Sequence, residues 1–278
     1  HAQNSAVFDE LIFGFSGATD AGVSPQDFYF AAPDGIDVGL DMDGAVTGME
    51  VNVGFLGTSV TDGAGFTLDM HADGGEPEMC GNGARCAARF AQVSGIAGAT
   101  LSFETDAGVV SAQINNDRVK VQMPEPSDLK MAYPLVLSNR SLEISSINTG
   151  VPHVVVMVEH VNDIDVIAVG RKIRFHQSFA PAGTNVNFVQ RQKGNSIEIR
   201  TYERGVEDET LACGTGAIAS AIISASQFGM TSPIDVRTHS GVYLSIHFEF
   251  KEGQFSNIRM EGDARIIYLG KLQPEAWQ

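Results

Sequence analysis

The chain has 278 residues, 43% of them hydrophobic, and a formal net charge of −16 at pH 7. Such a charge argues against nucleic acid and an anionic membrane surface as partners, and the apolar runs are shorter than a membrane span. The chain does not open with the charged and then apolar segment that is typical of a secretory signal peptide, so we expect a soluble, cytoplasmic protein.

The first part of the chain predicts short strands separated by turns. Residues 11–13 are an apolar Leu-Ile-Phe patch, and residues 66–71 alternate as a half-buried strand does before a turn at residues 72–75. Further on, residues 100–105 and 108–114 predict a hairpin, and residues 118–123 predict another strand.

Between the turn at residues 72–75 and this hairpin lies the first candidate for catalysis. Cys80-Gly81-Asn82-Gly83 predicts a tight turn, and the small, helix-favouring residues that follow predict a helix. A thiol at this point lies near unpaired backbone N–H groups and the positive end of the helix dipole, which stabilise a thiolate. Cys80 is therefore a candidate base.

The second half repeats this order of elements. Pro124-Glu125-Pro126-Ser127 breaks the strand pattern, so we place the domain limit there. Short strands follow at residues 144–147, 154–158, 185–190 and 196–202. Cys213-Gly214-Thr215-Gly216 then opens a second run of small and apolar residues, and residues 233–270 return to strands. The two cysteine turns lie about half the chain apart, which indicates two similar halves.

Two thiols at facing helix starts suit the inversion of a carbon that carries an acidic hydrogen. A base must remove the proton from one face while an acid returns one from the other. The Gly-x-Gly amides beside each thiol can hold a carboxylate and its developing charge. This is the chemistry of a cofactor-independent amino-acid racemase or epimerase. We expect no cofactor, and no metal either, since Asp163 and Asp165 show no metal-ligand spacing with any histidine.

Several motifs, in order along the chain, resemble those of the diaminopimelate epimerase family. They are Glu78 to Cys86, Gly150-Val151-Pro152-His153, Asn185 to Val189, Tyr202-Glu203-Arg204-Gly205 and Cys213-Gly214-Thr215-Gly216. The resemblance implies a homodimer and the interconversion of LL- and meso-2,6-diaminopimelate without pyridoxal phosphate, in the synthesis of lysine and peptidoglycan precursors.

The resemblance also implies an α+β fold with two pseudo-symmetric domains and the active site between them. Each domain would be a curved, mostly antiparallel sheet or barrel around a central helix. We expect the first domain at residues 1–125 and the second at residues 126–263. Residues 264–278 would then return to the first domain as a C-terminal strand.

The resemblance assigns roles to individual residues. Cys80 and Cys213 would be the acid and base, and His153 and Glu203 would tune them. Substrate contacts would come from the following residues: Gly81, Asn82, Asn185, Glu203, Arg204, Gly214, Thr215, His71 and Gln26. His71 and Gln26 stand where the family has asparagine. Cys86 lacks a Gly-x-Gly context, so we interpret it as a packing residue.

Two alternatives stay open from the sequence. A proline or hydroxyproline racemase would use the same two-thiol chemistry, but its pattern has histidine after the first Cys-Gly, where this chain has Asn82. A member without catalytic activity is the second alternative. It is motivated by Gln26, by His71 and by the apolar Leu56-Gly57 where the family has a polar substrate contact.

Overall fold

The computed structural model describes residues 11–15, 53–56, 65–68, 81–93, 95–105, 108–137 and 140–270. The described chain forms two compact units. Unit 1 holds the described residues up to Val119 and from Asp263 onward, and unit 2 holds Lys120–Gly262 apart from the gap at 138–139. The sequence predicted domain limits between residues 125 and 126 and between residues 263 and 264. In the structure the chain passes from unit 1 to unit 2 between residues 119 and 120, within the strand Arg118–Gln122. It returns to unit 1 between residues 262 and 263, within the strand Gln254–Asp263.

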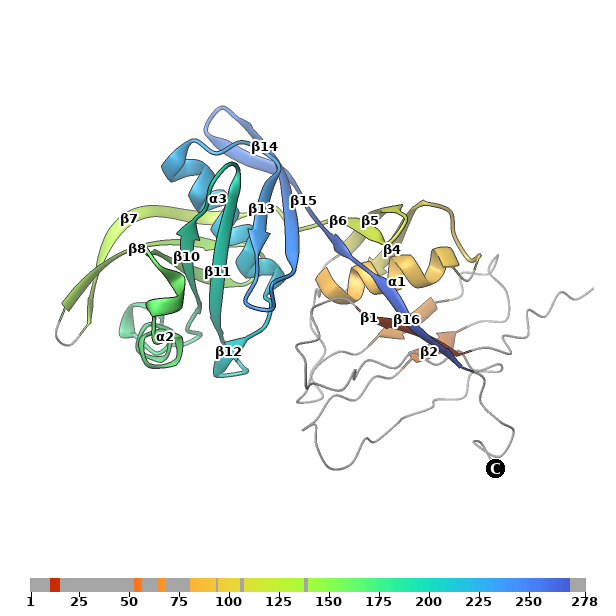
Figure 1. The fold of residues 1–278 in the computed structure, drawn as a ribbon, viewed down its shortest axis with the longest axis horizontal. Coiled ribbons are helices and arrows are strands. Elements are labelled where there is room, and N and C mark those ends of the chain that lie inside the picture. Colours follow the sequence, from red (N-terminus) through yellow and green to blue (C-terminus); the bar gives the residue numbers. More distant parts are fainter. Residues whose placement is uncertain are drawn as a thin grey trace, which may run out of the picture. The chain divides into compact units, whose positions relative to one another are not determined.

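Unit 1 combines short strands with one long helix among its described residues. Its elements are β1 (Leu11–Phe15), β2 (Val53–Leu56), β3 (Gly65–Leu68), α1 (Gly81–Val93), β4 (Thr100–Thr105), β5 (Gly108–Asn115), the start of β6 (Arg118–Gln122) and β16 (Arg265–Gly270). β4 and β5 form the predicted antiparallel hairpin. The C-terminal β16 pairs antiparallel with β1, so the two ends of the described chain lie side by side in this unit (Figure 1).

Unit 2 is built on one sheet in the order β15-β14-β13-β11-β10-β9-β8-β7, with β12 beside β11. Its strands are β7 (Ser127–Leu137), β8 (Arg140–Asn148), β9 (Pro152–Met157), β10 (Asn185–Arg191), β11 (Ser196–Glu203), β12 (Asp208–Thr210), β13 (Ile234–Arg237), β14 (Tyr243–Lys251) and β15 (Gln254–Asp263). Two of the pairs, β9 with β10 and β11 with β13, are parallel. The other pairs within this sheet whose register is described are antiparallel.

The helix α3 (Gly214–Phe228) is the centre of unit 2. It contacts β8, β9, β10, β11, β13 and β14, and its residues from Gly216 to Ala225 are all buried. A helix that is buried on every side is largely apolar all round, which matches the many Ala and Ile residues of α3. Its buried Ser220 donates its hydroxyl to the Gly216 carbonyl of the same helix. A curved, mostly antiparallel sheet around a central helix is therefore confirmed for this unit (Figure 1).

The sequence analysis missed the helix α2 (Val166–Arg174). Asp165 caps its start, since the Asp165 Oδ1 accepts a hydrogen bond from the Ala168 N–H at 2.9 Å. Ile173 packs in the core, and Gly170 lies so close to Tyr202 that an added Cβ would be 2.5 Å from the tyrosine Cβ. Nine residues with only a narrow apolar face give a weak periodic signal.

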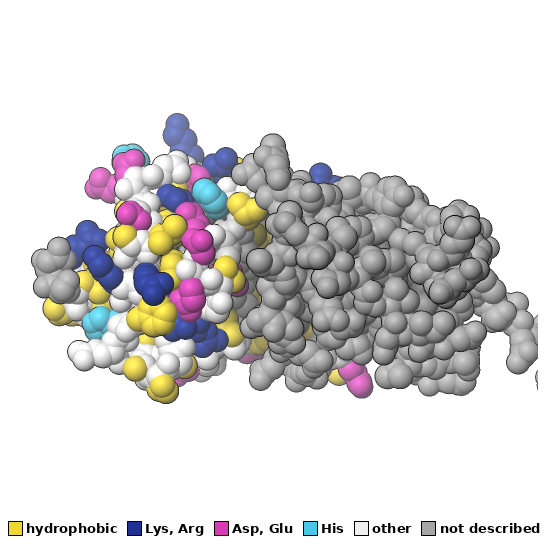
Figure 2. Space-filling view, turned by 90° about the horizontal axis from the view of Figure 1, so that it is seen from below, with side chains coloured by type: hydrophobic (Ala, Val, Ile, Leu, Met, Phe, Trp, Pro, Cys, Tyr) yellow, Lys and Arg dark blue, Asp and Glu magenta, His cyan; other side chains and the backbone are white. Residues whose placement is uncertain are grey.

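Charged side chains of both signs are interspersed over the face of unit 2 that Figure 2 shows. Among the residues that the structure describes, no helix is both long enough and apolar enough to cross a lipid bilayer.

Candidate active site

Cys213 is the N-cap residue of α3, as the Cys-Gly-x-Gly pattern predicted. Its side chain is buried, and its Sγ accepts a hydrogen bond from the Gly216 N–H at 3.4 Å. The Thr215 hydroxyl oxygen lies 3.5 Å from the same sulfur. Sulfur at this position receives a backbone N–H at the positive end of a fifteen-residue helix, which favours negative charge on it.

The backbone around Cys213 is held from two other parts of unit 2. The Thr149 hydroxyl, which is buried, donates to the Thr215 carbonyl at 3.0 Å. The Ser240 N–H donates to the Leu211 carbonyl at 3.0 Å. These contacts fix the chain on both sides of the cysteine.

Asn187 lies directly behind the Cys213 turn. A Cβ added to Gly216 would be 2.3 Å from Asn187 Oδ1 and 3.2 Å from Cys213 Sγ. Asn187 has no exposed surface, and its Oδ1 accepts a hydrogen bond from the Thr201 hydroxyl at 3.0 Å. The sequence analysis gave Asn187 no role, although asparagines at 185 and 187, on either side of an apolar residue at the start of a strand, were a signal that could have identified it.

His153 contacts Asn187 through one ring nitrogen, since its Nδ1 lies 3.1 Å from Asn187 Nδ2. The ring is 1% exposed, and within the described residues its Nε2 has no hydrogen-bond partner. Burial, together with the positive charge of Arg204, lowers the pKa of His153 to about 3. The imidazole is therefore neutral at physiological pH.

Asn185 lies beside His153, and Glu203 and Arg204 come at the end of the next strand, β11. Asn185 is opposite His153 in the parallel β9–β10 pair. The Asn185 Oδ1 accepts a hydrogen bond from the Arg204 N–H at 2.8 Å, and its Nδ2 donates to the Pro152 carbonyl at 3.3 Å. The Glu203 Oε2 accepts a hydrogen bond from the Thr210 hydroxyl at 2.8 Å.

Unit 2 thus brings together five of the residues that the sequence assigned to the site. They are linked by hydrogen bonds, by strand register and by the short segment of chain from β12 to α3: Cys213, His153, Asn185, Glu203 and Arg204. Gly214 and Thr215, which the sequence also assigned to the site, directly follow Cys213 as the first residues of α3. The side-chain amide of Asn185 also holds two backbone groups, the Arg204 N–H and the Pro152 carbonyl.

A second network supports the turn that carries Arg204. The Arg174 guanidinium on α2 makes an ion pair with Glu207 at 2.9 Å and donates to the Ala182 carbonyl at 3.4 Å. Arg204 donates to the same carbonyl at 3.5 Å. Burial by itself would raise the pKa of Glu207, but the Gly205 N–H and Arg174 outweigh it and lower that pKa.

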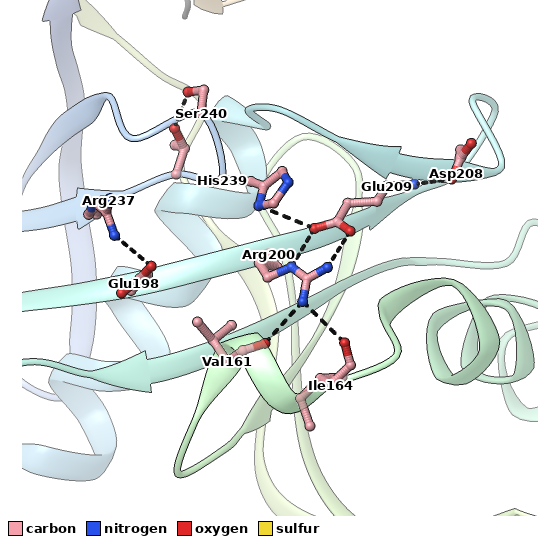
Figure 3. Close-up of polar contacts among 10 residues, drawn as sticks. Val161, Ile164, Glu198, Arg200, Asp208, Glu209, Arg237, His239 and Ser240 are labelled. Carbon is pink, nitrogen blue, oxygen red and sulfur yellow. Dashed lines mark hydrogen bonds and ion pairs between the residues drawn. The ribbon is translucent and has the colours of Figure 1, made fainter. Parts of the chain in front are cut away.

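A third network lies where β11 and β12 pair (Figure 3). Arg200 donates two hydrogen bonds to the Glu209 carboxylate, each at 2.6 Å. Its remaining Nη1 donates to the carbonyls of Val161 and Ile164, at 3.2 and 3.1 Å. The hydrogen bonds that Arg200 donates to the Glu209 carboxylate raise the pKa of Arg200. The pair holds β12 against β11, and β12 leads into the Cys213 turn.

In unit 1 the helix α1 starts at Gly81, directly after Cys80, as predicted. Arg85 is 2% exposed, and its guanidinium donates to Asn82 Oδ1 at 2.9 Å, to the Gly81 carbonyl at 3.3 Å and to the Asp263 carbonyl at 3.4 Å. It therefore holds the first turn of the helix. Cys86 is buried in the same helix.

Some predicted site residues lie outside the described residues. They are Cys80, His71 and Gln26. Among the residues that are described, no group of three or more His, Cys, Asp or Glu side chains is placed to hold a metal ion.

A family model described as diaminopimelate epimerase matches residues 48–128 and 145–267, which is well over half of the chain. The chain belongs to the diaminopimelate epimerase family. A family member from Aquifex aeolicus (strain VF5), named diaminopimelate epimerase, is 46% identical over 210 residues, which cover 74% of each chain. Another with that name, from Chlorobaculum tepidum, is 36% identical over 224 residues, covering 79% of this chain and 84% of the relative. The family predicted from the sequence motifs is therefore confirmed.

Solved structures of other proteins share the fold of this epimerase family member. A probable proline racemase from Agrobacterium radiobacter K84 superposes with a TM-score of 0.56 at 15% identity, covering 77% of this chain and 73% of the racemase. At this identity the likeness concerns the fold alone. It confirms the α+β fold class and adds no support to the proline racemase alternative.

Proposed function

We propose that this protein is an isomerase that interconverts LL- and meso-2,6-diaminopimelate without pyridoxal phosphate. The observation that carries the proposal is the Cys213 thiol at the start of α3, with the Gly216 N–H on its sulfur. The matching Cys80-Gly81-Asn82-Gly83 turn directly before α1, together with membership of the diaminopimelate epimerase family, supports it.

The reaction needs one proton removed and one returned. A thiolate takes the α-hydrogen of the amino acid and becomes a thiol, leaving a carbanion at the α-carbon. The thiol of the other cysteine gives its proton to the opposite face of that carbon and becomes a thiolate. Cys80 and Cys213 exchange these roles when the reaction runs in reverse.

The remaining residues bind and orient the substrate. Backbone N–H groups of the two Gly-x-Gly turns hold the carboxylate next to the reacting carbon. Glu203 binds the amino group, and Arg204 and Asn185 bind the end of the substrate that does not react. The product serves the synthesis of lysine and of peptidoglycan precursors, and the enzyme acts as a homodimer in the cytoplasm.

The direct test follows the α-hydrogen. Purified protein is incubated in deuterated water with diaminopimelate and, separately, with proline, and deuterium at the α-carbon is measured by mass spectrometry. We expect exchange into diaminopimelate and none into proline. Exchange into proline alone would favour the racemase alternative, and exchange into neither would favour a member without catalytic activity.

Substitution of the cysteines tests the two-thiol mechanism. Cys80→Ser and Cys213→Ser should each abolish turnover of diaminopimelate, because a serine hydroxyl is far too weak an acid and base at neutral pH. Cys86→Ser is the matched control, since this third cysteine lies within α1 and away from its first turn. Near-parental turnover in either of the first two variants would contradict the mechanism.

A further inference from the structure

The surroundings of Asn187 determine how its side-chain amide is oriented. One amide atom lies 3.1 Å from the Val154 carbonyl oxygen, and the other lies 3.0 Å from the Thr201 hydroxyl oxygen. A carbonyl oxygen only accepts hydrogen bonds, so the atom facing Val154 is the nitrogen Nδ2. The opposite orientation would place two acceptor oxygens 3.1 Å apart.

The same nitrogen determines where the proton of His153 lies. Asn187 Nδ2 has two hydrogens, of which one is donated to Val154 and the other faces His153 Nδ1 at 3.1 Å. A ring nitrogen that faces an N–H group must offer its lone pair, so His153 Nδ1 carries no proton. The neutral imidazole then carries its proton on Nε2.

That Nε2–H group has no acceptor among the described residues, and it is buried. Buried polar groups in folded proteins nearly always have a partner, so a donor left without one needs an explanation. The His153 Nε2–H group is buried, and Asn187 connects its ring to the Cys213 turn. Such an N–H group can donate to an anion that arrives with the substrate or forms during the reaction.

We propose that Asn187 is a positioning residue that holds His153 as the neutral Nε2–H tautomer, so that His153 donates a hydrogen bond to an anion and does not accept a proton. The anion is a carboxylate of the substrate or the thiolate of a catalytic cysteine, both of which accept from an N–H group. Burial of the ring, which lowers the pKa of His153 to about 3, opposes a second proton in the same way. The use of this donor in catalysis rests on the proposed function, whereas the tautomer does not.

Long-range ¹H–¹⁵N correlation spectra of histidine-labelled protein test the tautomer directly. The chain has seven histidines, and the spectrum of a His153→Gln variant assigns the signals of His153. At neutral pH we expect the Nδ1 signal in the range of an unprotonated ring nitrogen and the Nε2 signal in the protonated range. The reverse pattern, or two protonated nitrogens, would overturn the proposal without any variant at position 187.

Asn187→Asp tests whether Asn187 is the cause. A carboxylate can only accept, so it should draw the proton onto His153 Nδ1 and reverse the pattern or protonate both nitrogens. The kcat/KM for diaminopimelate should fall by at least about tenfold. If this variant does not fold, Asn187→Ser should leave a mixture of both tautomers. An unchanged His153 spectrum in a folded variant would contradict the proposal.

Asn195→Asp is the matched control. Asn195 is another side-chain amide of unit 2 whose Nδ2 donates to two backbone carbonyls, those of Thr231 and Pro233. Its replacement removes comparable hydrogen bonds without touching His153. The tautomer pattern of His153 should stay as in the parent protein, and a change there would mean that the spectrum reports general loosening of the fold.

Two further spectra identify the anion. A shift of the His153 Nε2–H signal on addition of diaminopimelate indicates a substrate carboxylate. A shift in Cys80→Ser or Cys213→Ser without substrate indicates a thiolate. If the signal moves in neither, the donor is not used in the site and that part of the proposal is wrong. The predicted tautomer in a protein that exchanges no α-hydrogen would contradict the proposed function and the use of the donor in catalysis, and it would leave the role of Asn187 in setting the tautomer standing.

Discussion

His153 shows how burial and one charge decide the protonation of a single side chain. The ring is almost fully enclosed, and water no longer stabilises its charged form. The guanidinium of Arg204 acts in the same direction. A histidine that follows Gly-Val-Pro in the sequence could equally have been a surface residue, so this state belongs to the folded protein.

Acid should therefore destabilise the protein through His153. Its pKa is about 3 in the folded protein, against an ordinary value of 6.5, so the unfolded chain binds the proton first as the pH falls. This contribution to stability is complete above pH 6.5 and is lost between there and about pH 3. Urea titrations should show that the parent loses about 3 kcal/mol more than His153→Gln on going from pH 6.5 to about pH 4.

The control for this effect is His239→Gln, which removes an imidazole whose side chain is 42% exposed. This variant keeps His153, so the loss of stability in acid that His153 causes should remain. Equal pH dependence of the parent and of His153→Gln would mean that His153 is already charged, or reached by water, in the folded protein.

The strand β12 is the element that connects the sheet of unit 2 to the Cys213 turn. It is only three residues long, Asp208–Thr210, and pairs with the end of β11. The backbone hydrogen bonds of so short a strand hold it only weakly. The Arg200–Glu209 pair (Figure 3) supplies a side-chain contact across the same two strands. The Thr210–Glu203 hydrogen bond supplies another.

Arg200→Ala should lower the free energy of unfolding by about 1–3 kcal/mol, because it removes both hydrogen bonds to the partly buried Glu209 carboxylate and those to two backbone carbonyls. Hydrogen exchange of the 209–213 segment should become faster, and turnover should fall with it. Chemical denaturation and exchange measured by mass spectrometry test both effects.

Arg237→Ala is the matched comparison on a neighbouring strand. Arg237 also pairs with a glutamate, Glu198 at 2.8 Å, but its side chain is 44% exposed against 16% for Arg200. Exposed ion pairs contribute little, so this variant should lose less than about 1 kcal/mol. An equal loss in the two variants would show that burial and the carbonyl contacts of Arg200 add nothing.

At the scale of the molecule, the chain begins and ends its described part in the same unit. β16 pairs with β1, and β1 contacts α1, whose first turn follows Cys80. The Ala264 N–H also donates to the Asp117 carbonyl at 2.7 Å, where the chain re-enters unit 1. The C-terminal strand therefore stabilises unit 1. It supports α1 through β1, although it lies far from α1 in the sequence.

Deletion of residues 264–278 should destabilise unit 1 selectively. Without β16, amide hydrogens of α1 should exchange markedly faster, while those of β9 to β11 in unit 2 keep their protection. Deletion of residues 271–278 leaves β16 in place and serves as the control. Uniform acceleration of exchange across both units in the longer deletion would mean that they unfold as one.

The sequence by itself determined the family and the local structure of the best-patterned stretches. The Cys-Gly-x-Gly turn predicted the start of α3 at Gly214, alternation predicted β14, and the sequence also predicted a hairpin at β4 and β5 and short strands at β10 and β11. These predictions succeeded because the residues of a tight turn, and the alternation of buried and exposed side chains along a strand, are set by a few neighbouring residues. The short helix α2 escaped because its Asp165 cap and narrow apolar face are weak local signals.

Only the tertiary structure decided which distant side chains meet. Parallel pairing of β9 and β10 sets His153 opposite Asn185, and the close approach of α3 to β10 sets Asn187 behind Cys213. Burial then lowers the pKa of His153, and the Val154 carbonyl orients the amide of Asn187. Strand register and desolvation arise from packing between segments far apart in the chain, so no local pattern encodes them.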